Sequence, residues 1–352
     1  MPTVRTTTTF AASAVESTQG CFEAEKLQAI LQAISVEGYA VVGDLVSGTT
    51  CAELLATSLE DAEQVRASQA ETRHERRTGR GHLQLGLRRH APYVSAELVA
   101  NPLTEQIVTG LLGQDAWLGF YNGNVNLPGS GYQPLHYDRP FSWRTPEAAA
   151  HDGQPWPPPT TTLSCSLALT HITEANGAAE IYPGSHLETA VTQWPEGERV
   201  SKHPELIEQR GEPSRMIIPG GGICFRDPRM WHRGVPNPGE QARPMIALTY
   251  HAARCLHWRG RLIHDLDPQA AAQCAQNVTL KVMDDGTLDD GRLVFDADTE
   301  AAFRPHSNPH GINRNVRFVQ PPQRVNHFVD AHTVGGARVV DDGRVQPLVE
   351  LS

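Results

Sequence analysis

Residues 220–250, GGGICFRDPRMWHRGVPNPGEQARPMIALTY, contain two apolar runs, ICF and MIALTY, that are separated by a stretch rich in Pro and Gly. Apolar runs of this length, bounded by turn-forming residues, predict β-strands rather than helices. His232 lies in the turn region between the two runs, and Arg243 follows eleven residues later at the start of the second run. This stretch therefore predicts two strands of a β core and places a histidine and an arginine at their ends.

The same character extends over residues 116–252, where short β-rich runs alternate with Gly and Pro. The clearest other runs are WLGFYNGNVNL, TTLSCSLALTHI, AEIYPG and RMIIPGGGICF. Helical spacing of apolar residues is found earlier, over 22–35, near 49–64 and around 95–113, with the strand-like GYAVV of 38–42 between the first two. Helices followed by many closely spaced strands predict one antiparallel β core with helices packed on its outside.

The ends of the chain differ from this core. Residues 1–20, rich in Thr, Ser and Ala, lack the apolar core of a secretory signal and are expected to form a flexible N-terminal tail. Residues 265–352 carry Asp-Asp-Gly turns at 284–286 and 341–343, which predict hairpins. We expect this C-terminal extension to pack on the core.

Composition excludes several classes of function. The 352 residues carry 30 Lys and Arg against 40 Asp and Glu, a net charge of −10, which argues against general nucleic-acid binding. No apolar run approaches 18 residues, so we expect no membrane span. The six cysteines are scattered without a CxxC pair and are typical of buried thiols in a cytoplasmic protein, with zinc or disulfides as the minor alternative. We expect a monomer or a homodimer.

Metal chemistry is suggested by His136 and Asp138 in GYQPLHYDRPF, because residues two apart on a strand project from the same face. Alone, this pair is better explained by a solvated turn. The ordered set His136, Asp138, His232 and Arg243 is more specific, since two His and one carboxylate on one face of an octahedral ion leave three positions open, as in non-heme Fe(II) oxygenases. Arg243 suits the distal carboxylate of a dicarboxylate co-substrate.

With these motifs the sequence resembles the phytanoyl-CoA dioxygenase-like family of Fe(II)/2-oxoglutarate-dependent oxygenases. The resemblance covers about residues 22–262 and rests on QPLHYD around His136, on EANGAAEIYPGSH at 174–186, on WHRG around His232, and on Arg243. The 96 residues between His136 and His232 also suit that family.

The resemblance implies a double-stranded β-helix, or jelly roll, over residues 21–264, with flanking N-terminal α-helices. It implies that His136, Asp138 and His232 hold Fe(II), that Arg243 binds the C5 carboxylate of 2-oxoglutarate, and that O2 is the second co-substrate. Gln133 matches a position where relatives place an amide against 2-oxoglutarate, although a strand-edge polar residue is nearly as good an explanation. Because halogenating relatives replace the carboxylate of the metal site, Asp138 favours hydroxylation, desaturation or rearrangement.

Two departures from the family pattern concern the co-substrate pocket. Relatives often carry Ala-Thr after the Asn-Gly, whereas this chain has Ala178-Ala179, and Gly234 replaces a Ser found in some members. Asn122, Asn124 or Asn126 could supply the missing polar contact, and Asn124 is the cofactor-binding candidate among them; alternatively, all three Asn face solvent, because they share one side of a strand.

Substrate contacts are less defined. Arg139, Trp143 and Trp231 neighbour the ligands in sequence and could line the substrate pocket, although such aromatics are as often core residues. The segment 73–90 has six Arg and one Glu and could attract an anionic substrate, or form a solvated loop. His327, Asp330 and His332 form a rival metal set with poor spacing, and His251 and His257 could have an outer role.

From these features we expect an Fe(II)/2-oxoglutarate-dependent dioxygenase that oxidises an unactivated C–H bond of a small molecule in specialised-metabolite biosynthesis. Succinate and CO2 would be the co-products. The alternatives are an acyl-CoA hydroxylase of the same family and a cupin-like metal-binding protein without oxygenase turnover.

Overall fold

The computed structural model describes residues 8–67, 79–87, 92–93, 95–113, 116–151, 153–195 and 198–252, and four short strands within 288–347. Within these ranges no helix combines the length and the apolar character needed to cross a membrane.

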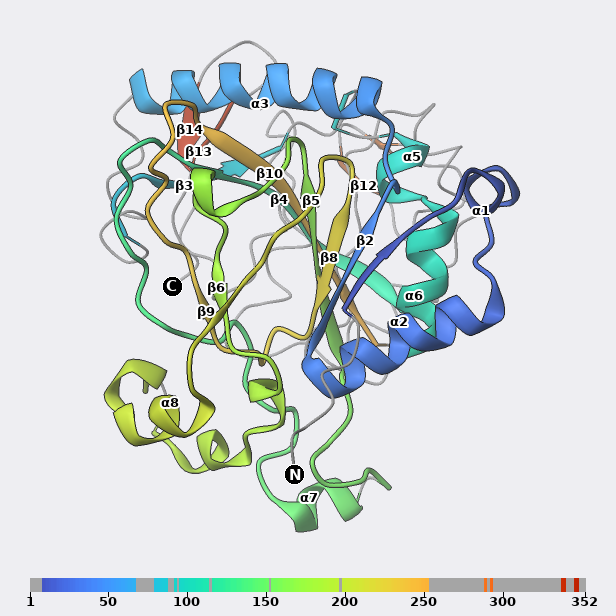
Figure 1. The fold of residues 1–352 in the computed structure, drawn as a ribbon, viewed down its shortest axis with the longest axis vertical. Coiled ribbons are helices and arrows are strands. Elements are labelled where there is room, and N and C mark those ends of the chain that lie inside the picture. The colour runs from blue at the N-terminus through green and yellow to red at the C-terminus, as the bar shows by residue number, and fades with distance from the viewer. Residues whose placement is uncertain are drawn as a thin grey trace.

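A large mixed sheet forms one layer of the molecule (Figure 1). Its strand order is β1-β2-β8-β5-β10-β4-β3-β13-β14. In chain order, these strands are β1 (Thr9–Ala11), β2 (Tyr39–Gly43), β3 (His82–Gly86), β4 (Trp117–Asn126), β5 (Thr162–Ala168), β8 (Ile223–Arg226), β10 (Arg243–His251), β13 (Ala337–Val339) and β14 (Val345–Pro347). The central strands β8, β5, β10, β4 and β3 pair antiparallel, as the sequence predicts.

A second, smaller sheet has the order β7-β6-β9. Its strands are β6 (Glu180–Ile181), β7 (Ser214–Arg215) and β9 (His232–Arg233). His136 extends this sheet through an isolated antiparallel bridge to His232. Two facing sheets whose central strands pair antiparallel confirm the predicted double-stranded β-helix.

Side-chain alternation gives the large sheet two different faces. Ile246 and Leu248 on β10 belong to the main hydrophobic core, whereas Met245 and Ala247, which alternate with them, line a cavity on the opposite face. Leu83 on β3 likewise belongs to the core, although it also borders the cavity. The core therefore lies between the sheet and the helices, and the cavity lies on the face turned toward the smaller sheet.

The helices that precede the core cover its outer face (Figure 1). The predicted helices of 22–35 and 49–64 are confirmed as α2 (Ala24–Glu37) and α3 (Gly48–Ala67). The predicted helix of 95–113 is instead split into α5 (Ala96–Val99) and α6 (Pro102–Leu112). Asn101 causes the break, because its side chain accepts hydrogen bonds from the backbone N–H groups of Leu103 and Thr104 and so starts a new helix.

The N-terminal segment differs from the expected flexible tail. Residues 9–19 form β1, which pairs parallel to β2, and α1 (Ala14–Gln19). Ser13 and Glu16 form a capping box at the start of α1, and Glu16 is buried and also pairs with Lys26 at 2.5 Å. This reciprocal capping and ion pairing explain the order, which composition alone does not reveal; residues 1–7 lie outside the described residues.

The remaining elements connect strands between β4 and β7 or lie in the C-terminal part. They are α7 (Pro146–His151), η1 (Glu174–Asn176), η2 (Ser185–Leu187), η3 (Thr189–Gln193), η4 (Val200–Lys202), α8 (Pro204–Arg210), β11 (Leu288–Asp289) and β12 (Arg292–Leu293). The hairpin predicted at 341–343 is confirmed by the pairing of β13 with β14, and β13 also pairs parallel to β3. The turn at 284–286 lies outside the described residues, and the domain limits at 264 and 265 stay a prediction.

Candidate metal centre

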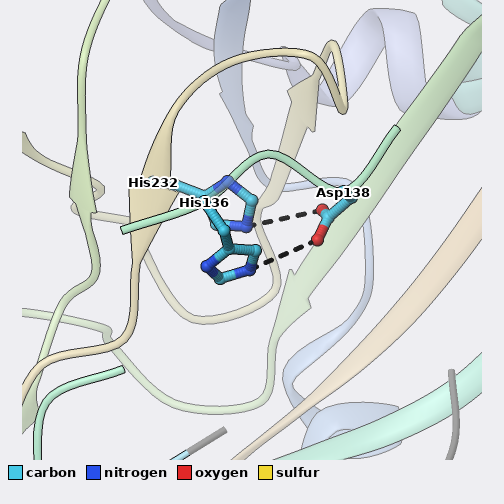
Figure 2. A group of neighbouring side chains, drawn as sticks. All are labelled: His136, Asp138 and His232. Atoms are coloured by element: carbon cyan, nitrogen blue, oxygen red, sulfur yellow. Dashed lines mark ion pairs between the residues drawn. The ribbon is translucent and has the colours of Figure 1, made fainter. Parts of the chain in front are cut away.

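Three residues that are far apart in the sequence come together at one point of the cavity. The candidate ligand atoms of His136, Asp138 and His232 all lie within 4.8 Å of one another. The Asp138 carboxylate lies 3.5 Å from Nε2 of His136 and 3.4 Å from Nε2 of His232, so both rings turn the same nitrogen toward it (Figure 2). The predicted set of two His and one carboxylate is thus brought together.

The second nitrogen of each imidazole is held by the backbone. Nδ1 of His136 lies 2.7 Å from the carbonyl oxygen of Pro134, and Nδ1 of His232 lies 2.9 Å from that of Met230. A carbonyl can only accept, so these contacts favour the tautomer with the proton on Nδ1 and leave the Nε2 lone pairs free. Together with one carboxylate, this donor set fits a divalent first-row metal such as Fe(II).

Backbone pairing fixes the positions of the three ligands. His136 and His232 exchange two hydrogen bonds, of 3.0 Å and 2.8 Å, and the N–H of Asp138 donates to the carbonyl oxygen of Pro228 at 2.8 Å. His136 makes only an isolated bridge, so Asp138 lies in a loop and not on the strand that we predicted. The two side chains nevertheless face one point, because the loop is tied to residues 228–232.

Burial and charge favour the protonation states that a metal site needs. Burial and the charge of Arg226 lower the pKa of His232 to about 4, so its ring is neutral at pH 7. Partial burial alone would raise the pKa of Asp138, but the charge of His232 in its protonated form and the charge of Arg226 hold it well below its ordinary value. A neutral imidazole beside an ionised carboxylate is the ligating form of both groups.

Arg226 is a part of this centre that the sequence reasoning missed. Its Nη2 donates to Oδ2 of Asp138 at 2.7 Å, and its side chain is almost fully buried. The only sequence signal was a charged residue at the end of the apolar run ICF. An Arg is ordinarily exposed, so a buried one at the end of a strand indicates a nearby anion.

Arg243 lies at the start of β10 and lines the same cavity. Its Nε and Nη2 donate to the carbonyl oxygens of Asn176 and Gly177 at 3.1 and 3.2 Å, and no carboxylate of the described residues forms an ion pair with it. Burial lowers its pKa to about 10, which leaves the guanidinium charged at neutral pH. A buried, charged guanidinium that faces a cavity fits the carboxylate of a dicarboxylate ligand.

Gln133 lies in the cavity wall, as predicted, but it is also part of a structural clip. Its side-chain Oε1 accepts a hydrogen bond from the backbone N–H of Gly234 at 2.8 Å, and its backbone N–H donates to the carbonyl oxygen of Gly234. A Cβ on Gly234 would lie 2.7 Å from Cε1 of His82 and 2.8 Å from Oε1 of Gln133. His82 and Gln133 therefore fill the space that a Ser at position 234 would need.

The three asparagines of β4 have different surroundings. Asn124 lines the cavity, as a cofactor-binding residue requires. Asn126 also borders it, but its amide donates to the carbonyl of Val235 and accepts from Ser130, so it supports the loop after His232. Asn122 is buried and accepts the N–H of Gly123. Ala179 also lines the cavity, so the position of the family's Thr offers no hydroxyl here.

The cavity is large, with a volume of about 860 Å³. Drug-sized ligands are bound in cavities of about 300–1,000 Å³. Its lining includes polar side chains of the large sheet, Gln84, Ser164 and Ser166, and the aromatic side chains of Phe141 and Trp194 on the opposite side. The cavity therefore offers hydrogen-bonding and apolar surfaces next to the metal centre.

Of the three predicted substrate residues, only Arg139 is among the described residues that line this cavity. Trp231 is instead fully buried in a separate apolar cluster with Leu135 and Tyr182. His232, the next residue, lines the cavity, whereas Trp231 does not. Trp143 is half-buried and also lies outside the cavity lining. A contact of either tryptophan with a substrate stays a prediction.

The other sequence candidates lie elsewhere. His327, Asp330, His332 and His257 fall outside the described residues, as do most arginines of 73–90. The described part of that segment forms β3, whose His82, Leu83 and Gln84 line the cavity. His251 is buried at the end of β10, where its Nδ1 lies 3.2 Å from the hydroxyl of Thr162.

A double-stranded β-helix with two His, one carboxylate and a buried Arg in one cavity defines the architecture of a non-heme metal oxygenase. The model of the phytanoyl-CoA dioxygenase (PhyH) family matches residues 34–245, more than half of the chain. The chain therefore belongs to this family.

Two similar curated proteins are fungal dioxygenases. The chain is 32% identical to the dioxygenase trt7 of Aspergillus terreus over 157 residues. These residues make up 44% of this chain and 48% of trt7. The chain is 23% identical over 189 residues to the dioxygenase af480 of Aspergillus fumigatus, which is 52% of this chain and 54% of that protein. The chain thus matches about half the length of these relatives.

Two of the solved structures that match the chain are low-identity neighbours. AviO1 from Streptomyces viridochromogenes matches with a TM-score of 0.45 and 18% identity, covering 64% of this chain and 95% of its own. The non-heme alpha-ketoglutarate-dependent epimerase SnoN from nogalamycin biosynthesis also matches with a TM-score of 0.45 and 18% identity, and this match covers 66% of this chain and 84% of SnoN.

Proposed function

We propose that the chain is an Fe(II)/2-oxoglutarate-dependent dioxygenase that oxidises an unactivated C–H bond of a small molecule in specialised-metabolite biosynthesis, releasing succinate and CO2. The observation that carries this proposal is the pairing of two sites in one cavity. His136, Asp138 and His232 converge as metal ligands, and Arg243 is a buried guanidinium without a carboxylate partner among the described residues. Family membership and dioxygenase relatives support the same conclusion.

Each residue has a defined part in this proposal. His136, Asp138 and His232 would hold Fe(II), which with 2-oxoglutarate supplies the O2-dependent C–H oxidation. Arg243 would bind the distal carboxylate of 2-oxoglutarate, held in place by its hydrogen bonds to the carbonyls of Asn176 and Gly177. Asn124 and the free N–H groups of the Gln133 amide are available to the same ligand.

The far wall of the cavity would receive the substrate and exclude water from it. Arg144 holds this wall, because its guanidinium donates to the carbonyls of Thr192 and Trp194 at 2.7–3.0 Å. Trp194 is further fixed by stacking on His203, with ring centroids 3.9 Å apart. An aromatic surface that is held this firmly suits a rigid, largely apolar substrate.

The direct test is anaerobic addition of Fe(II) and then 2-oxoglutarate to the full chain. We expect a visible metal-to-ligand charge-transfer band in the wild type and its loss in His232→Ala. In Arg243→Met the 2-oxoglutarate concentration for half-saturation should rise at least about tenfold, since a charge-assisted bidentate contact is lost. Arg66→Ala removes an exposed arginine of α3 and should leave the band unchanged.

The alternatives give different results in the same experiment. A metal-binding protein without turnover would bind Fe(II) but show no charge-transfer band at saturating 2-oxoglutarate. An acyl-CoA hydroxylase would show the band and form succinate only with a CoA thioester. The absence of the band from the wild type would refute the proposed function.

A further inference from the structure

Arg226 places a buried positive charge beside the candidate metal ligands. Its side chain is 8% exposed, and Nη2 lies 2.7 Å from Oδ2 of Asp138. A charge removed from water is tolerated only when a counter-charge and hydrogen bonds accompany it. Asp138 is the one carboxylate of the described residues that forms an ion pair with this guanidinium.

The contact joins a rigid element to a loop. Arg226 ends β8, where it pairs with Tyr39 on β2 and with Ser164 on β5 inside the large sheet. Asp138 lies in the loop after His136, held otherwise by the hydrogen bond from its N–H to Pro228. The sheet therefore sets the orientation of the carboxylate through Arg226.

The two oxygens of Asp138 have different surroundings as a result. Oδ2 accepts the bond from Arg226 and lies 3.4 Å from Nε2 of His232, whereas Oδ1 lies 3.5 Å from Nε2 of His136. A carboxylate held in this way by an outer partner presents its remaining lone pairs in a fixed orientation, and such partners orient ligands and tune the metal.

Arg226 also affects His232. Its Nη1 lies 3.1 Å from Nδ1 of His232, the nitrogen that also lies 2.9 Å from the carbonyl oxygen of Met230. Arginine can only donate and a carbonyl can only accept, so Nδ1 satisfies one of them at a time. When Nδ1 carries the proton for Met230, Nε2 can bind a metal, and Arg226 then depends on Asp138 alone.

A fixed positive charge at this place favours the lower charge state of a bound metal. Loss of one electron from Fe(II) raises the charge of the metal by one, which a neighbouring guanidinium disfavours, and burial limits the screening of this effect by salt. Neutralising Arg226 would also make Asp138 a stronger donor, which favours Fe(III). Both effects therefore act in the same direction.

We infer that Arg226 is a positioning residue that orients Asp138 toward the resident iron and, through its positive charge, stabilises the ferrous state. This inference rests on the proposed function, because it requires iron at His136, Asp138 and His232.

The test is a mediated potentiometric titration of the Fe(II)-loaded full chain without 2-oxoglutarate, followed by the EPR signal of Fe(III). At a fixed solution potential, Arg226→Gln should show a ratio of Fe(III) to Fe(II) at least about tenfold above the wild type, which equals a midpoint about 59 mV lower. Arg226→Lys, which keeps the charge, should lie near the wild type. Arg233→Gln is the matched control, because Arg233 adjoins His232 but pairs with Glu180, is 34% exposed and should shift the midpoint much less.

An unchanged or higher midpoint in Arg226→Gln would overturn the inference, and so would an equal shift in Arg226→Lys. If Arg226→Gln does not retain iron, retention by Arg226→Lys supports the inference and loss from both variants overturns it. Failure of the wild type to bind iron through His232 would instead refute the proposed function.

Discussion

The buried pair of Asp227 and Arg229 should contribute strongly to the stability of the loop that carries His232. Asp227 is 1% exposed and accepts hydrogen bonds from Nε and Nη2 of Arg229 at 2.7–3.2 Å and from Thr160 at 2.7 Å. Arg229 also donates to the carbonyl of Pro158 at 2.8 Å. Asp227→Asn leaves this guanidinium buried without its anion, which costs about 3–5 kcal/mol of unfolding free energy.

The assay is guanidinium chloride unfolding, with Glu63→Gln as the control. Glu63 pairs with Arg66 at 3.1 Å, but both side chains are more than half exposed, so this change should cost no more than about 0.5 kcal/mol. The double variant Asp227→Asn/Arg229→Met should cost less than the sum of its single variants, because it leaves no unpaired charge in the interior. A cost for Asp227→Asn as small as that of the control, or strict additivity in the double variant, would refute this reasoning.

Three further results are expected. The pH dependence of stability should include Asp227, because burial alone would raise its pKa but the charge and hydrogen bonds of Arg229 hold that pKa below its ordinary value. The contribution of Asp227 to the free energy of unfolding is therefore complete above about pH 4 and is lost as the pH falls through the folded-state pKa. Asp227→Asn should not show this loss in acid titrations. Gly234→Ser should lower the free energy of unfolding by about 1–3 kcal/mol and weaken 2-oxoglutarate binding in the charge-transfer titration, because the new Cβ would meet His82 and Gln133. Gly48→Ala should change neither measurement, because a Cβ on Gly48 would have nothing within 4 Å. Glu16→Gln should lower the free energy of unfolding by about 1 kcal/mol and speed hydrogen exchange in β1 and α1. Burial opposes ionisation of Glu16, but bonds from Lys26 and Ser13 lower its pKa to about 2, so its contribution in the wild type is lost between about pH 4 and pH 2. The same loss of stability between these pH values in the variant would contradict this assignment.

The sequence predicted those parts of the fold whose cause is local. Short apolar runs between Gly and Pro became β4, β5, β8 and β10, because alternation and turn residues act within a few positions. The N-terminal strand β1 was missed, since its order depends on parallel pairing with β2, about 30 residues away. Asn101 shows the opposite case, because a cap that divides a helix was readable in the sequence but was overridden by apolar spacing.

The metal centre shows the same limit more sharply. His136, Asp138 and His232 could be identified because their order and spacing match a known motif, and the structure brings them together as that motif implies. Arg226 belongs to no motif, and it meets Asp138, 88 positions away, because the loop of Asp138 is hydrogen-bonded to residues 228–232, which follow β8. The motif therefore specifies which atoms can hold a metal, whereas the packing of this chain specifies the charge that surrounds it. Since that charge affects which oxidation state is stable, two chains with the same four motif residues can differ in metal chemistry through a residue that the motif does not include.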